Sequence, residues 1–243
     1  TGSMAQRTSP LGARSRARAR SPSRVLGRDA LAVLRIRDYR IYWLGAVLSK
    51  LGTEMQQVAL AWQIYATTGE PLTLGWVGLL RAGPALVLPI LGGAMGDALP
   101  RRTLLLAIDA GHVLLSTTLA VLTLRGEAGL AALYGFVFLT ACLSSLEGPV
   151  RGTLTPALVP RELLTPAVAL NNLQWSAAAV VGPAIGGLAL GAFGAGTVYA
   201  IDAASFVAIA ASLFFLRTTL LVPALSAEER SPAGHVKRIG EGF

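Results

Sequence analysis

The sequence contains very little cysteine, histidine and charge. One cysteine, Cys142, and two histidines occur among 243 residues. A single thiol excludes an intrachain disulfide, and His112 has no metal-ligand companion at suitable spacing, so we predict no metal site. Charged residues make up only 14% of the chain, whereas hydrophobic residues make up 53%. This balance lies outside that of soluble domains and indicates a membrane protein.

The residue patterns of common enzyme sites are also missing. No spacing suits a nucleophilic triad or a phosphate-binding glycine loop. Gly92 and Gly93 have no strand before them, so a dinucleotide site does not fit their context. We therefore predict no catalytic residues and no cofactor.

Long apolar segments, by contrast, are abundant. A helical membrane crossing needs about 20 mostly apolar residues. Hydrophobicity that is continuous rather than strictly alternating favours helices over a transmembrane barrel. The sequence predicts six such helices, at approximately 41–67, 72–96, 103–124, 130–148, 167–193 and 197–216.

Positive charge is distributed unevenly between the two sides of these segments. Ten basic residues precede Ile41, and others fall between the second and third, between the fourth and fifth, and after the sixth segment, whereas the opposite side carries only Arg125. The positive-inside rule then places both ends of the chain in the cytoplasm. The Arg-, Ser- and Pro-rich stretch 1–37 is predicted to be a disordered basic tail. A basic run beside a membrane span usually contacts anionic lipid, so no nucleic-acid partner is predicted.

The connection between the second and third segments resembles the loop signature of the major facilitator superfamily of secondary transporters. The resemblance rests on Gly93, Asp97, Arg101, Arg102 and Leu104. It implies an all-α membrane protein in which 38–217 form a six-helix half of the bundle, built from two inverted three-helix repeats. The stretch 218–243 would then be a cytoplasmic linker that begins a missing second half.

A second segment, Gly182, Pro183, Gly186 and Gly187, lies in the fifth predicted helix. Small residues four apart let another helix approach closely, and this spacing alone favours simple helix packing. The ordered Gly-Pro-x-x-Gly-Gly string also resembles the antiporter motif of exporters in the same superfamily. Next to the loop signature, it points to an exporter that exchanges its substrate for protons.

The loop from Pro149 to Asn171, together with residues 37–45, resembles the drug-exporter branch that includes bacterial macrolide and siderophore exporters. This resemblance implies efflux of a largely apolar small molecule across the cell membrane by alternating access. The expected partners are the substrate, protons, the lipid bilayer, and either the second half or a second copy of the chain.

A few polar residues lie within the apolar segments, where charge needs a reason. Glu54 is the deepest, and Lys50 lies one turn before it, so the two are predicted to pair. The pair either fixes the first helix or exposes a carboxyl group to a central pathway. Arg81, Gln57 and Asp202 are the other candidates for a substrate or proton pathway.

Near the cytoplasmic ends, Glu147 and Arg151 lie one turn apart. In the superfamily such residues join the loop residues (here Gly93, Asp97, Arg101 and Arg102) in a cluster that closes the inner side, so the resemblance implies a conformational gate. Asp109 is expected to pair with a loop arginine, and His112 to be satisfied inside the bundle.

Two alternatives stay open. A nutrient importer or uniporter would use the same fold, although the segment from Gly182 to Gly187 speaks against it. A truncated, non-transporting membrane module would explain why no second set of helices follows.

Overall fold

A computed structural model describes residues 32–98 and 100–217, with side chains except at 91–98. The predicted tail up to residue 31 and the predicted linker 218–243 lie outside the described residues. Residues 32–36, which the tail prediction included, form a helical turn closed by bonds from the Arg35 and Ile36 amides to the Ala32 and Val33 carbonyls.

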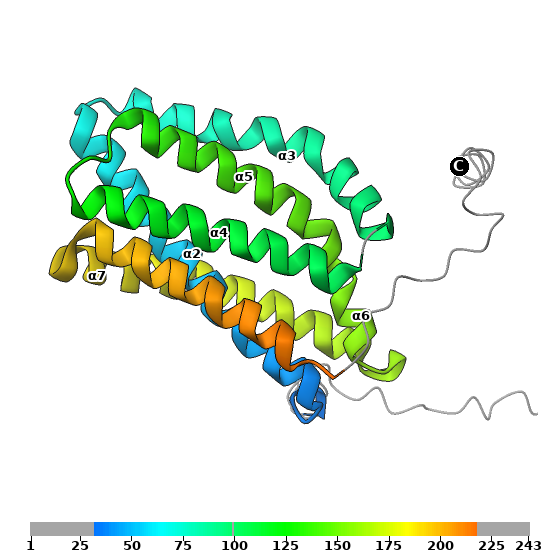
Figure 1. The fold of residues 1–243 in the computed structure, drawn as a ribbon. Helices are drawn as coiled ribbons and strands as arrows, with labels where there is room; N and C mark the ends of the chain where they lie inside the picture. Colours follow the sequence, from blue (N-terminus) through cyan, green and yellow to red (C-terminus); the bar gives the residue numbers. More distant parts are fainter. Residues whose placement is uncertain (1–31, 99, 218–243) are drawn as a thin grey trace, which may run out of the picture.

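All regular secondary structure in the described residues is helical (Figure 1). This confirms the predicted all-α class. The elements are α2 (Arg37–Thr68), α3 (Leu72–Ala98), α4 (Arg101–Leu124), α5 (Leu130–Gly152), the short α6 (Leu154–Leu158), the 3-10 helix η1 (Arg161–Leu163) and α7 (Leu164–Phe215).

Two helix boundaries differ from the prediction. The tight loop expected over 92–102 is shorter, because α3 continues to Ala98 and α4 begins at Arg101. Pro100 precedes the first residue of α4, a position where the fixed φ of proline suits a helix start. The fifth and sixth predicted helices form the single element α7, whose backbone leaves helical geometry at Gly194 (φ 78°, ψ 168°).

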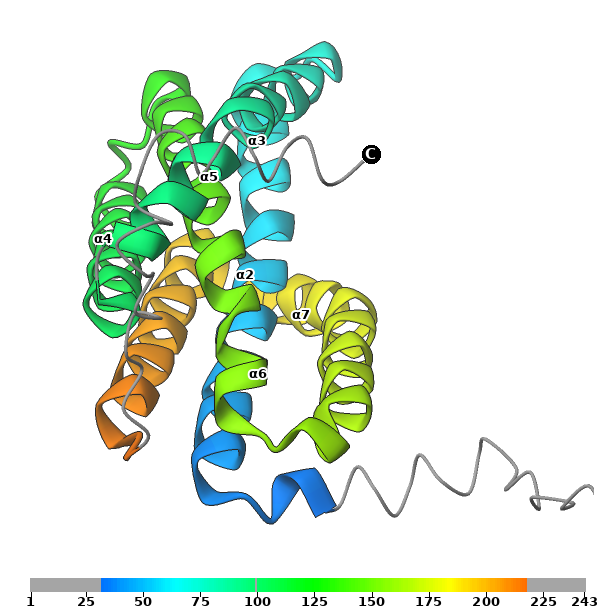
Figure 2. The same cartoon turned by 90° about the vertical axis from the view of Figure 1, so that its right-hand side faces the viewer.

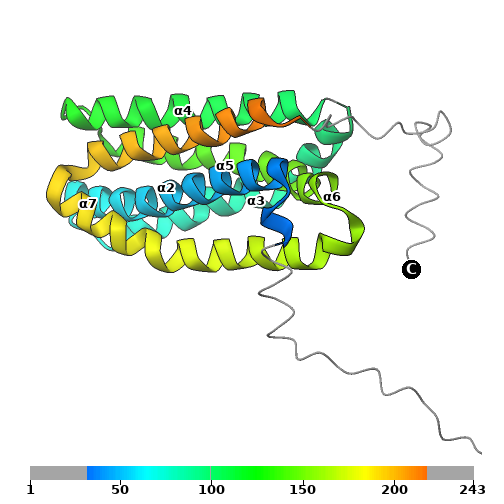
Figure 3. The same ribbon diagram turned by 90° about the horizontal axis from the view of Figure 1, so that it is seen from below.

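Gly194 divides α7 into two arms, which we call the first arm (164–193) and the second arm (195–215). The arms fold back on each other, and α2 lies between them, as Figures 2 and 3 both show. α2 makes its most extensive packing with α7. In the rest of the bundle, α4 packs on α7 and α5, and α3 packs mainly on α5.

Glycines bring α2 close to both arms. A Cβ added at Gly186 would lie 2.7 Å from the Met55 Cα, and one at Gly182 would collide with the Glu54 side chain. Toward the second arm, a Cβ added at Gly45 of α2 would lie 2.9 Å from the Ser212 hydroxyl. These contacts agree with the close approach predicted at Gly182 and Gly186.

The neighbouring ridge does not take part in this seam. A Cβ at Gly187 would meet nothing within 4 Å among the described residues, so the close helix approach expected at this glycine stays a prediction. Pro183 is half-buried inside the first arm. The crossing of α2 therefore follows one ridge of the first arm only.

The interior consists of two apolar clusters at opposite ends of the bundle. One contains Tyr39, Leu105 and Ile209, and the other contains Leu60, Val137 and Tyr199. On α2, α4, α5 and the second arm of α7, residues of the two clusters are separated by positions that carry polar side chains. The middle of the bundle is therefore its polar part.

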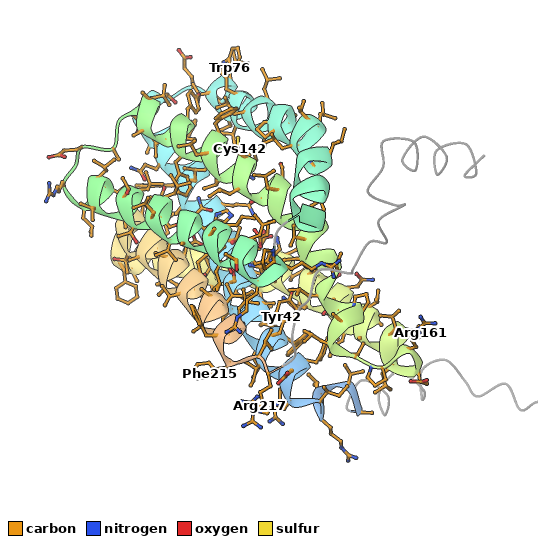
Figure 4. All side chains as sticks on the ribbon, turned by 45° about the vertical axis from the view of Figure 1, so that its right-hand side comes forward. Tyr42, Trp76, Cys142, Arg161, Phe215 and Arg217 are labelled. Carbon is orange, nitrogen blue, oxygen red and sulfur yellow. The ribbon has the colours of Figure 1, made fainter. Side chains whose placement is uncertain are left out.

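The outer surface is strongly apolar. Leu86 is 79% exposed, Ile90 78% and Leu188 76%, and Trp76 projects outward from α3 (Figure 4). Four segments are long and apolar enough to cross a membrane, namely Leu72–Ile90, Arg101–Leu124, Leu130–Leu158 and Arg161–Phe215. Such surface is stable in lipid rather than in water, and the chain is a multi-pass membrane protein.

Candidate functional site

A cavity of about 300 Å³ lies at the middle of the bundle, at the level between the two apolar clusters. Helices α2, α3, α4, α5 and both arms of α7 contribute to its wall. The lining residues are Lys50, Thr53, Gln56, Gln57, Arg81, Ala85, His112, Phe136, Thr140, Ala141, Ser144, Ser145, Trp175, Asp202 and Phe206.

Arg81 enters this cavity from α3. Its Nη1 donates a hydrogen bond of 2.8 Å to Gln57 Oε1 of α2, so two predicted pathway residues meet in the cavity wall. The side chain is partly buried, and none of the ion pairs among the described residues includes it.

Lys50 and Glu54 form the predicted pair, with 2.6 Å between Nζ and Oε1. The Lys50 ammonium also lies 4.0 Å from the centre of the Trp175 ring on the first arm. Lys50 and Trp175 line the cavity, whereas Glu54 is absent from its wall and packs against Gly182. In this structure the lysine of the pair, and not its carboxyl group, lines the cavity.

Asp202 of the second arm is 1% exposed and lines the cavity. The Ser116 hydroxyl donates a 2.6 Å hydrogen bond to its Oδ2. Its Oδ1 is buried without a hydrogen-bond partner among the described residues. His112, one turn before Ser116 on α4, stacks on Phe206 with ring centres 4.3 Å apart.

A cluster of charged groups adjoins this wall. Arg151 Nη2 lies 2.6 Å from Asp109 Oδ1, and Arg151 Nε also pairs with Glu147. His112 Nε2 lies 3.5 Å from Glu147 Oε2. The cluster therefore connects α4 to the last turns of α5 and reaches the cavity through His112.

The other predicted gate residues are arranged differently. Arg102 Nη2 donates a 2.9 Å hydrogen bond to the Phe214 carbonyl, which ties α4 to the end of α7. Arg101 is the first residue of α4. Gly93 and Asp97 lie in the last turns of α3, where side chains are not described. The structure thus joins Glu147 to Arg151 but brings in Asp109 rather than the loop arginines.

Figure 4 shows Phe215 and Arg217 together at one side of the molecule, far from Trp76. Arg37 Nη1 donates to the Phe215 carbonyl at 3.2 Å, and the Arg217 amide donates to Asp38 at 3.0 Å. The bonds from Arg37 and Arg102 satisfy carbonyls at the end of α7 that have no partner within the helix, and the bond from the Arg217 amide ties the residue after the helix to Asp38. The end of α7 is therefore fixed to the starts of α2 and α4.

Sequence reasoning missed several cavity residues. Ser116, Thr53 and Trp175 carry no helical spacing that marks them, because their partners lie on other helices. His112 was expected to be merely satisfied inside the bundle, yet it lines the cavity. Its spacing of three residues from Asp109 was the one available signal, since such residues share a helix face.

The chemistry of this arrangement is that of binding and proton exchange. The wall combines two cationic side chains, one buried carboxyl group, several hydroxyl and amide groups, and apolar rings. Within the described residues no group of three or more potential ligands could hold a metal ion. A cavity of this composition suits a small molecule that is partly apolar and partly polar.

Comparison with known proteins agrees with a transport site. Residues 28–233 match the family described as transmembrane secretion effectors. The staphyloferrin A transporter of Staphylococcus aureus is 27% identical over 68% of this chain and 42% of its own length. Macrolide efflux protein A of Streptococcus pyogenes is 22% identical over 66% of this chain and 40% of its own length. The enterobactin exporter EntS of Shigella boydii is 27% identical over 84% of this chain and 48% of its own length.

The chain spans less than half the length of these relatives. No solved structure matches it. The family match nevertheless extends over most of the chain, and the relatives are transporters rather than enzymes. The chain therefore belongs to the major facilitator superfamily, in the branch that contains drug and siderophore exporters.

Proposed function

We propose that this chain forms one half of a proton-coupled exporter that moves a largely apolar small molecule out of the cell. The observation that carries the proposal is the mid-bundle cavity, in which Asp202 offers a buried carboxyl oxygen without a hydrogen-bond partner among the described residues. The names of the macrolide and enterobactin relatives support the direction of transport.

We propose six membrane crossings, namely α2, α3, α4, α5 and the two arms of α7. The turn at Gly194 supports this number, because the 55 residues of Arg161–Phe215 are enough for two crossings of about 20 residues each. Each three-helix set would be one inverted repeat. A second half, or a second copy of the chain, would close the open side of the cavity, as the coverage of the relatives suggests.

The orientation follows from charge. Arg101, Arg151, Arg161 and Arg217 belong to the end of the bundle that also contains the start of α2, whereas Arg125 lies at the other end. The positive-inside rule places the first end in the cytoplasm of a cell membrane. The cavity would then open alternately toward the cytoplasm and the outside.

In the mechanism we propose, a proton from outside binds Asp202 and removes its charge. The neutral carboxyl group interacts differently with His112 and the cavity cations, which shifts the balance between the two access states. On the inner side, the pairs that Arg151 makes with Asp109 and Glu147, and the bond from Arg102 to α7, would form in one state and become hydrated in the other. These residues would then set conformational populations without contacting substrate.

The test is gradient-driven uptake of dyes into inside-out membrane vesicles that contain the full-length carrier. Three probes cover the substrate charge: ethidium (a cation), N-phenyl-1-naphthylamine (neutral) and 1-anilinonaphthalene-8-sulfonate (an anion). We expect at least one to accumulate, and a protonophore to abolish its accumulation. The proposal fails if no probe moves, or if movement is indifferent to the gradient.

Variants separate the two carboxyl groups. Asp202→Asn should abolish gradient-driven uptake and leave downhill movement of the dye. Glu54→Gln should lower transport only through the unpaired Lys50, since Glu54 does not line the cavity. Glu127→Gln, in the exposed connection between α4 and α5, is the matched control. Full coupling in Asp202→Asn would remove this residue from the proton pathway.

A further inference from the structure

Among the described residues, Arg81 is a cation of the cavity wall that takes part in no ion pair. The neighbouring cations Lys50 and Arg151 do have ion-pair partners, since Lys50 pairs with Glu54, and Arg151 pairs with Asp109 and Glu147. The hydrogen bond that Arg81 makes among the described residues goes to the neutral amide oxygen of Gln57.

A guanidinium without an ion-pair partner at membrane depth is unfavourable and needs a compensating interaction. Arg81 is the tenth residue of α3, which begins at Leu72, and it lies midway along the apolar segment Leu72–Ile90. A position this far from the helix ends leaves the charge away from the membrane surfaces. The cavity is then the place from which compensation can come.

The geometry of Arg81 suits an anionic ligand. Gln57 accepts a bond from Nη1, which orients the guanidinium and leaves its remaining donors for other acceptors. A planar guanidinium binds carboxylate, sulfonate or phosphate oxygens through two parallel bonds. If the ligand were neutral, a neutral side chain such as an amide could bind it, and an arginine would not be needed at this position.

The rest of the wall suits the apolar body of such a molecule. Phe136, Ala85 and Ala141 provide apolar contact, and Trp175 adds an aromatic ring from the first arm of α7. Lys50 is seven residues before Gln57, about 10 Å along α2. Because Glu54 and Trp175 already engage the Lys50 ammonium, Arg81 is the anion-binding group of this wall.

We propose that Arg81 recognises an anionic group on the transported molecule, so that the substrate is an organic anion with an apolar body. This inference deepens the proposed function and depends on it. A carboxylate of the second half that pairs with Arg81 would be the competing arrangement, and in that arrangement Arg81 would affect all substrates alike.

A matched pair of probes tests the charge alone. 1-Anilinonaphthalene-8-sulfonate and N-phenyl-1-naphthylamine share the same aromatic body, and only the first bears a sulfonate. In vesicles containing the full-length carrier, we expect the wild type to take up the sulfonate in preference. Arg81→Gln should lower uptake of the sulfonate about tenfold or more, as the loss of a charge-assisted contact implies, while neutral-probe uptake changes less than about twofold.

Two further variants complete the design. Arg81→Lys keeps the charge but loses the two-pronged geometry, so it should restore part of the sulfonate uptake. Arg125→Gln removes the same charge from the exposed end of α4, outside the cavity, and should leave both probes unchanged. The amount of carrier in the membrane, measured by fluorescence-detected gel filtration, excludes loss through misfolding.

The outcomes distinguish this inference from the proposed function. Equal loss of both probes in Arg81→Gln, or a wild type that moves the neutral probe and rejects the sulfonate, overturns the anion site and leaves proton-coupled export intact. Failure of the wild type to move any of the three dyes overturns the proposed function itself.

Discussion

At the scale of single residues, the interior of this bundle is organised by the compensation of charge. Asp109 is completely buried, and its compensation comes from Arg151 at 2.6 Å. Removing one member of a buried ion pair destabilises a protein more than replacing both members by apolar residues, because the remaining charge keeps its desolvation penalty. The effect should be largest for substitution of Arg151, because this side chain pairs with two carboxylates.

We predict that Arg151→Gln lowers the free energy of unfolding by about 3–5 kcal/mol, because it leaves Asp109 and Glu147 without their common partner. Thermal unfolding of the purified protein in detergent is the measurement. Arg161→Gln is the control, since Arg161 is exposed next to α7 (Figure 4) and should change stability by less than about 0.5 kcal/mol.

A second substitution tests whether the effect comes from unpaired charge. Asp109→Asn combined with Arg151→Gln removes one of the stranded carboxylates. The double variant should therefore be more stable than Arg151→Gln alone. If the two losses simply add, the pair is not coupled and the charge argument fails.

At the scale of helices, the central feature is the clamp in which the two arms of α7 hold α2. The contacts rely on missing side chains on both partners, with Gly182 and Gly186 on the first arm, and Gly45 and Gly52 on α2 toward the second arm. Packing of this kind leaves no space for an added side chain, because the helix backbones are already in contact.

We predict that Gly186→Leu destabilises the bundle by about 1–3 kcal/mol or more and sharply lowers transport, because the new side chain would collide with the Met55 backbone. Ala184→Leu, which adds side-chain bulk at an exposed position of the same helix, is the control and should be tolerated. Stability in detergent and dye uptake are measured together. Equal damage from both changes would contradict a specific seam.

The turn between the arms makes a separate prediction. Gly194 has φ 78° and ψ 168°, a backbone region that is essentially restricted to glycine. Gly194→Ala should cost about 1–3 kcal/mol of stability. Gly191→Ala, one turn earlier in open helical surroundings, should be neutral or stabilising. Similar effects of the two substitutions would show that a side chain at position 194 does not strain the backbone of the turn.

At the scale of the whole molecule, local sequence patterns predicted what happens within one helix, but not how helices meet. The pair of Lys50 and Glu54 follows directly from a spacing of four residues. The bond between Ser116 and Asp202 joins residues 86 positions apart. It depends on how α4 and α7 are rotated about their axes, and a hydrophobic pattern that is apolar on all sides contains no such information.

The same reasoning explains why the sequence left two positions undecided. Glu54 and Lys50 share a helix face, so spacing alone could not tell which of them lines the cavity. Gly186 and Gly187 are neighbours on adjoining ridges, and only the packing of α2 decides which ridge is used. The α3–α4 connection is shorter than predicted because its charged residues begin α4 rather than separating the helices.

We predict that the 243 residues alone do not transport, because the uncovered side of the cavity would place Arg81 and the polar wall against lipid. Reconstitution in liposomes with an imposed proton gradient should show no dye movement until the second half is supplied. A mass determination in detergent accompanies the assay. Gradient-driven movement by a purified homodimer would instead identify a complete dimeric transporter.

The clamp around α2 also has a consequence for biosynthesis. α2 is missing from the four most apolar segments, and its side chains at Gln57 and Gln63 find their partners on α3 and the second arm of α7. During translation α2 leaves the ribosome long before that arm does, because synthesis proceeds at about 5–20 residues per second. Until then, the charge of α2 is reduced by its internal pairs, Lys50 with Glu54 and Arg37 with Asp38. We therefore expect α2 to stay in contact with the membrane-insertion machinery until the second arm of α7 has been synthesised. Crosslinks between α2 of the nascent chain and this machinery should disappear once the second arm has emerged from the ribosome.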